Sequence, residues 1–201
     1  NVALKWGQNN FAMATIKFHL SEALLGRGKP DDLAQARTLA GEILDTYRGM
    51  FAPLNPHHPL VARASRRVGY LSDLLGQGAA ARPFYVEALR IREANAGEPW
   101  PAGITALDLG RLLRDAGGEA ARADARAALS RALELLDAVP PGTRDDAPRA
   151  RVALAELELL DGKPGAAEPL AKAVINRQPP VPTPVAAAAR AVLARVLLAR
   201  G

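Results

Sequence analysis

The residues with the clearest potential for chemistry lie in "FAPLNPHHPLVARASRR", residues 51–67, where two adjacent histidines stand between prolines. Imidazole is a common metal ligand and general base. A metal site, however, needs several ligands that converge on one point, and the only other histidine is the distant His19. A proline such as Pro59 suits the first turn of a helix, where its missing N–H costs nothing. We therefore interpret His57 and His58 as the boundary before a helix.

Other motifs with catalytic potential also have structural explanations. "GQGAAA", Gly76 to Ala81, fits the dinucleotide fingerprint, but the preceding "VGYLSDLL" has the pattern of a helix where that fingerprint needs a strand. The carboxylate pair Asp31 and Asp32 is explained by helix capping and the helix dipole. Four serines and three dispersed histidines offer no catalytic triad. We expect no catalytic residue, no cofactor and no metal, and hence not an enzyme.

The composition limits which compartments and which kinds of partner fit this protein. The 201 residues are 49% hydrophobic, enough for a continuous core, and include no cysteine, which favours a cytoplasmic location. No apolar stretch is long enough to span a membrane, and aromatic residues, at 4%, are too sparse for stacking on single-stranded nucleic acid. We expect neither membrane nor nucleic acid as a partner. Because the chain begins at Asn1 and not at a methionine, we also expect it to be part of a longer protein.

The net charge is +5, and arginine outnumbers lysine by 21 to 5. Such a surplus suits acidic partners, because guanidinium groups bind carboxylates through paired N–H donors. A GC-rich genome that favours arginine codons explains the same bias. The charge alone leaves both explanations open.

Hydrophobic residues recur with the period of a helix throughout the chain, and no strand pattern is convincing. Glycine turns and proline loops alternate between the expected helices, which indicates helix pairs. The expected helices are Phe11 to Gly26, Asp31 to Gly49, Pro59 to Leu75, Ala79 to Ala96, Pro101 to Asp115, Glu119 to Ala138, Ala147 to Leu160, Gly165 to Asn176 and Pro184 to Ala199.

A repeated plan underlies these pairs, in which an apolar anchor and a small residue are followed by leucines, a turn glycine and a second apolar helix. The anchors, 39 to 48 residues apart, are Leu20, Val68, Leu109, Leu154 and Leu193. Small residues beside them, such as Gly69 and Gly110, let two helices approach closely. This periodicity predicts an all-α solenoid of stacked helix pairs.

The segment "HPLVARASRRVGYLSDLLGQGAAARPFYVEALRIRE", His58 to Glu93, resembles a tetratricopeptide repeat (TPR) of the kinesin light chain type. The resemblance extends over nearly the whole chain. It implies a right-handed superhelix formed by a single TPR array over residues 1–201. The implied repeats are 11–50, 59–96, 101–138 and 147–176, followed by a terminal helix at 184–200.

The resemblance also implies a concave groove lined by the first helix of each repeat. On the family's register, the groove-facing positions of the first three repeats include Thr15 and Ile104. The candidate site residues among these positions are Phe18, Glu22, Arg63, Arg66, Tyr70, Asp73, Leu107, Arg111 and Arg114. The fourth repeat adds Arg149, Val152, Glu156 and Leu159. Many relatives carry an asparagine pair at Arg66 and Arg67, so the arginines favour acidic side chains over backbone clamping.

We therefore expect a protein- or peptide-binding scaffold that holds an acidic segment in its groove. By analogy with similar arrays, it would be part of a larger bacterial signalling protein. Two alternatives remain open. The arginines can form an ordinary solvated face, and the terminal helix, with Leu193, Val196 and Leu197, can mediate association into a homo-oligomer.

Overall fold

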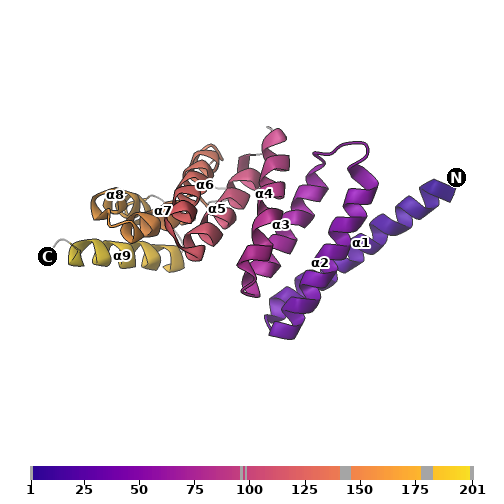
Figure 1. The fold of residues 1–201 in the computed structure, drawn as a ribbon, viewed down its shortest axis with the longest axis horizontal. Helices are drawn as coiled ribbons and strands as arrows, with labels where there is room; N and C mark the ends of the chain where they lie inside the picture. Colours follow the sequence, from indigo (N-terminus) through magenta and orange to yellow (C-terminus); the bar gives the residue numbers. More distant parts are fainter. Residues whose placement is uncertain (1, 96, 98, 141–145, 178–182, 200–201) are drawn as a thin grey trace. The chain divides into compact units, whose positions relative to one another are not determined.

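The structure, a computed structural model, describes residues 2–95, 97, 99–140, 146–177 and 183–199. Within these ranges every regular element is an α-helix (Figure 1). The helices are α1 (Val2–Arg27), α2 (Pro30–Phe51), α3 (Pro59–Leu74), α4 (Gly78–Ala94), α5 (Pro99–Ala116), α6 (Glu119–Asp137), α7 (Ala147–Leu160), α8 (Pro164–Ile175) and α9 (Thr183–Leu198). The predicted all-α organisation is confirmed.

Nearly all helix ends lie within two residues of those predicted from the sequence. The exception is α1, which begins at Val2 and not at Phe11. The polar segment "GQNN" interrupts the hydrophobic period, but it contains no proline, so nothing in it breaks a helix. The predicted end at residue 96 and the last residue of the predicted terminal helix, 200, lie outside the described residues.

Glycines end several helices in a conformation that other residues adopt only with strain. Gly76 follows α3 with φ of +71°, and Gly28 and Gly162 end α1 and α7 with φ of +67° and +69°. A side chain at such a φ clashes with the following carbonyl, which glycine avoids. The "GQG" that formally fits a nucleotide-binding fingerprint is therefore the turn between α3 and α4.

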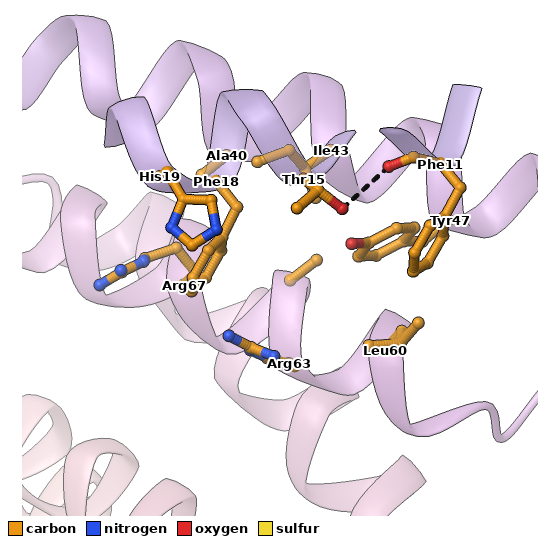
Figure 2. A pocket seen from close by; sticks show the side chains of 11 residues that line it. Phe11, Thr15, Phe18, His19, Ala40, Ile43, Tyr47, Leu60, Arg63 and Arg67 are labelled. Atoms are coloured by element: carbon orange, nitrogen blue, oxygen red, sulfur yellow. Dashed lines mark hydrogen bonds between the residues drawn. The ribbon is translucent and has the colours of Figure 1, made fainter. Parts of the chain in front are cut away.

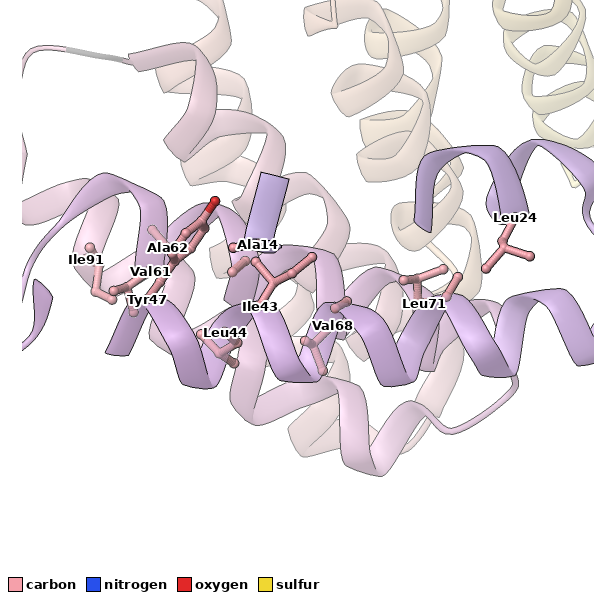
Figure 3. Close-up of a cluster of buried hydrophobic side chains, with 13 residues drawn as sticks. Ala14, Leu24, Ile43, Leu44, Tyr47, Val61, Ala62, Val68, Leu71 and Ile91 are labelled. Atoms are coloured by element: carbon pink, nitrogen blue, oxygen red, sulfur yellow. The ribbon is translucent and has the colours of Figure 1, made fainter. Parts of the chain in front are cut away.

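The chain divides into two compact units, Asn1–Glu98 and Pro99–Gly201. In unit 1, helices adjacent in the chain pack on one another from α1 to α4. Their shared core contains residues from all four helices (Figure 3). Its buried members are Ala14, Leu24, Ala36, Ala40, Ile43, Leu44, Tyr47, Val61, Ala62, Ala64, Val68, Leu71 and Ile91.

Small residues set the distance between paired helices, as the sequence predicts. In unit 1, the position of a Cβ on Gly69 of α3 lies 3.1 Å from the Tyr85 ring of α4. In unit 2, a Cβ on Gly110 of α5 would lie 2.6 Å from Cγ of Leu129 on α6. Because even one methyl group would collide there, glycine is what allows α5 and α6 to pack this closely.

The last helix, α9, packs back onto its own unit. Val192 and Val196 of α9 are buried against Ala155 of α7 and against Ala167 and Ala171 of α8. Leu193 is partly buried in the same cluster, and Leu197 is exposed. Of the three apolar residues that suggested association through this helix, Val196 is buried, Leu193 is partly buried and Leu197 is exposed. Association into a homo-oligomer therefore stays a prediction.

Candidate functional site

The first helices of the pairs are spaced differently in the two units. In unit 2, α7 approaches both α5 and α9 to within 8 Å between Cα atoms, whereas in unit 1 the described parts of α1 and α3 do not approach so closely. Long side chains bridge α1 and α3 instead. The result is a pair of adjoining cavities on this face of unit 1.

The first cavity, the arginine pocket, has a volume of about 240 Å³. Its lining combines three guanidinium groups with one carboxylate and two aromatic rings. The lining residues are Phe18, Glu22, Arg63, Arg66, Arg67 and Tyr70. Guanidinium groups such as these suit a carboxylate ligand, which accepts paired hydrogen bonds from them.

The second cavity, the apolar hollow, has a volume of about 280 Å³ and shares Phe18, Arg63 and Arg67 with the arginine pocket. Its walls come from α1 and α3, and its floor comes from α2 (Figure 2). The lining residues are Phe11, Thr15, Phe18, His19, Ala40, Ile43, Tyr47, Leu60, Arg63, Ala64 and Arg67. In Figure 2 the rings of Phe11 and Tyr47 close one end of the hollow, and Phe18, His19 and Arg67 close the other.

Phe18 lines both cavities and lies close to two of the arginines. The guanidinium carbon of Arg63 lies 4.3 Å from the centre of its ring, and that of Arg67 lies 5.6 Å away. Cations at these distances are attracted to the negative face of the ring. The two contacts hold α3 side chains against α1 and orient the arginines toward the pocket.

Arg67 is partly buried in the arginine pocket, with 18% of its side chain exposed. Burial lowers the pKa of Arg67, and the nearby Tyr70 offsets part of this effect. A guanidinium removed from water needs anionic partners. Glu22 of α1 supplies one in an ion pair with Arg67 Nη2.

Five of the nine predicted site residues meet in the arginine pocket: Phe18, Glu22, Arg63, Arg66 and Tyr70. Asp73 is exposed on α3 and lines neither cavity. The structure differs from the prediction at Leu107, which is completely buried in α5 and cannot face an open groove. Every residue of α5 from Ala102 to Gly110 is buried, so the family's register does not distinguish groove-facing from core positions in this part of the helix.

The remaining two predicted residues lie in unit 2. Arg111 lines a separate cavity of about 220 Å³ with Arg149, Val152 and Glu156, which were also predicted to share a surface. Arg114 is mostly buried and pairs with Asp115 and Glu156. Burial lowers the pKa of Arg114, but the hydrogen bonds and charges of these two carboxylates outweigh it and raise the pKa above its ordinary value. Arg114 is therefore already neutralised.

The sequence prediction missed two parts of the site. Arg67 was considered only as the neighbour of Arg66 and was not among the candidate groove residues, although it lies four residues after Arg63, a spacing that places both on one helix face. The floor of the apolar hollow, Ile43 and Tyr47, was missed because only first helices were considered. Only the packing of α2 beneath the gap between α1 and α3 brings Tyr47 to this site.

The two histidines act as predicted, as a boundary between helices. His58 is the N-cap of α3, where its Nδ1 accepts a hydrogen bond of 3.2 Å from the Leu60 N–H, and its ring stacks on Phe51 at 3.9 Å. His57 links this boundary to α4 mainly through its backbone, because its carbonyl oxygen accepts a 2.6 Å hydrogen bond from Nδ2 of Asn95, the residue that follows α4. In the described residues, no group of three or more histidines and carboxylates is arranged to hold a metal ion.

A scan against protein-family models found no match, and a search of curated proteins found none either. In the part of the chain that the structure describes, no helix has the length and apolar character to cross a membrane.

Solved structures do match the fold. The nearly identical TPR-like repeats of a kinesin light chain-type protein from Podosopora anserina superpose with a TM-score of 0.74 at 14% identity, covering 94% of this chain and 88% of that one. A variant of those repeats superposes with a TM-score of 0.75, at the same identity and coverage. BtubC (BKLC) from P. vanneervenii superposes with a TM-score of 0.65 at 14% identity, covering 97% of this chain and 84% of that one. This chain therefore has the all-α solenoid fold of TPR-like repeats of the kinesin light chain kind.

Proposed function

We propose that unit 1 binds a peptide segment of a partner protein on the face formed by α1 and α3, with an acidic side chain of the segment in the arginine pocket. The observation that carries this proposal is that Arg63, Arg66 and Arg67 line one pocket together with Phe18, and that the lining contains one carboxylate, Glu22. Guanidinium groups bind carboxylates in paired, directional hydrogen bonds. TPR-like folds also generally serve as protein-binding scaffolds, which supports a binding function over a catalytic one.

In this proposal the apolar hollow binds a second side chain of the same peptide. Because it shares Phe18, Arg63 and Arg67 with the arginine pocket, a short peptide can place an apolar side chain in one cavity and an acidic side chain in the other. Burial of the apolar side chain contributes affinity, while the arginines select for charge. In this proposal the chain is the partner-binding part of a larger bacterial signalling protein.

The test compares two fluorescein-labelled, end-capped peptides by fluorescence anisotropy. One alternates leucine and glutamate, and the other has glutamine in place of every glutamate. We expect the acidic peptide to bind more tightly, with an affinity that falls as salt screens the charges. Equal affinity for both peptides, or no dependence on salt, would contradict the proposal.

A charge reversal in the pocket locates the binding site. Arg66→Glu should lower the affinity for the acidic peptide by about tenfold or more, because it replaces an attraction with a repulsion. Arg90→Glu makes the same change of net charge on the exposed surface of α4, outside both cavities. A similar loss in both variants would show that the peptide responds only to overall charge and not to the arginine pocket.

A further inference from the structure

The ion pair between Glu22 and Arg67 affects whether Arg67 is available to an acidic ligand in the arginine pocket. The pair joins α1 to α3, and both of its members line the pocket. The carboxylate of Glu22 thus occupies a guanidinium that an acidic ligand would need. The chain already contains a carboxylate of the kind that the pocket is suited to bind.

The two members of the pair differ in exposure. The Glu22 side chain is 46% exposed, while that of Arg67 is 18% exposed. Arg67 is held in place by its burial and by the ring of Phe18. Glu22 reaches the pocket from the solvent edge of α1, and a flexible, exposed carboxylate can return to water at little cost. The exchangeable partner is therefore Glu22, and Arg67 is the fixed one.

Resting on the peptide-binding function proposed above, we infer that Glu22 is an internal competitor that neutralises Arg67 in the free protein and must be displaced when an acidic partner binds. Such a residue keeps a buried cation paired while the site is empty. It also lowers the affinity of every acidic partner by the free energy of the broken pair. An acidic partner therefore binds well only when its own interaction with Arg67 is stronger than that of Glu22.

The experiment measures the affinity of the acidic leucine–glutamate peptide for the wild type and for Glu22→Gln at about 0.15 M salt. Loss of the competing carboxylate should tighten binding by about threefold, the size expected for an exposed ion pair. The neutral glutamine peptide should bind both proteins equally. Since Glu22 is exposed, thermal unfolding followed by circular dichroism should show that the variant remains folded.

Two further variants separate displacement from a general change of charge. Asp45→Asn removes one negative charge from an exposed position of α2 that lines neither cavity, so it should change the affinity much less than Glu22→Gln does. In an Arg67→Gln background, Glu22→Gln should bring no gain, because the pair is already absent.

The outcomes distinguish this inference from the proposed function. If the wild type prefers the acidic peptide but Glu22→Gln binds it no more tightly than Asp45→Asn does, the internal competitor is refuted and peptide binding stands. A gain that persists without Arg67 refutes it as well. If neither protein prefers the acidic peptide, the proposed function fails, and the inference that rests on it fails too.

Discussion

The guanidinium of Arg63 lies over the ring of Phe18, 4.3 Å from its centre, and so connects α3 to α1, whose described Cα atoms do not come within 8 Å of each other. This contact also separates the apolar hollow from the arginine pocket, since both residues line both cavities. The position of one side chain thus affects the shape and the charge of the candidate site together.

The first prediction concerns that contact. Arg63→Lys keeps the positive charge but replaces a planar group, able to stack and to donate paired hydrogen bonds, with a compact ammonium. We expect the affinity for the acidic peptide to fall by about threefold to tenfold. Arg90→Lys, outside the site, should leave it unchanged. An Arg63→Lys variant that binds like the wild type would show that charge alone matters at this position.

The second prediction concerns the close approach of α5 and α6. In Gly110→Ala the new methyl group would meet Leu129 at 2.6 Å from Cγ and 3.1 Å from the backbone nitrogen, so the helices must move apart. We expect the free energy of unfolding to fall by about 2 kcal/mol. Gly41→Ala, also within a helix, meets nothing within 4 Å and should be neutral or stabilising by up to about 1 kcal/mol. Urea denaturation of both variants provides the measurement, and equal stabilities would disprove the steric explanation.

The third prediction concerns an arginine that joins α6 to α7. Arg126 donates to both oxygens of Glu158, at 3.0 and 2.8 Å, and to Asp161 at 2.7 Å, and both carboxylates are mostly buried. Arg126→Met should destabilise the protein by about 2 kcal/mol, because it leaves the Glu158 and Asp161 carboxylates short of partners.

Lys172→Met is the control for this prediction. Its ion pair with Glu168 lies within one helix, and 57% of the lysine side chain is exposed. Its loss should therefore cost less than about 0.5 kcal/mol. Denaturant titrations in which both variants lose the same stability would mean that the burial of the carboxylates does not matter.

The fourth prediction separates the two adjacent histidines. His58→Ala removes the N-cap acceptor of α3 and the stacking on Phe51, and we expect a loss of about 1 kcal/mol. His57→Ala keeps the backbone carbonyl that accepts from Asn95, so the loss should be smaller. Thermal unfolding of the wild type with zinc or with a chelator should be unchanged. Stabilisation by zinc that depends on His58 would restore the metal interpretation.

Much of the fold follows from local sequence signals. Gly76, Gly28 and Gly162 mark turns because only glycine adopts their positive φ without strain, and Pro59 marks a helix start because proline suits the first turn. The small residues Gly69 and Gly110 predicted close helix packing because their size limits the approach of the partner helix. These signals act within a few residues, so they can be read without the structure.

The candidate site is only partly predictable in this way. The register of the first helices placed Phe18, Glu22, Arg63, Arg66 and Tyr70 on one surface, and they do meet. The same register failed at Leu107, because burial depends on how many neighbours surround a helix and not on its own periodicity. It also overlooked Arg67 and Tyr47, whose roles depend on the spacing between helices.

The sequence by itself determined the helices, their turns, their pairing and the basic character of the face between α1 and α3, because propensity, periodicity and charge are properties of short segments. Only the tertiary structure decided that α1 and α3 stay apart over α2, that Glu22 pairs with Arg67, and that α9 folds back onto α7 and α8. These features depend on contacts between residues far apart in the chain, where side-chain volume and burial select among arrangements that the local pattern allows equally.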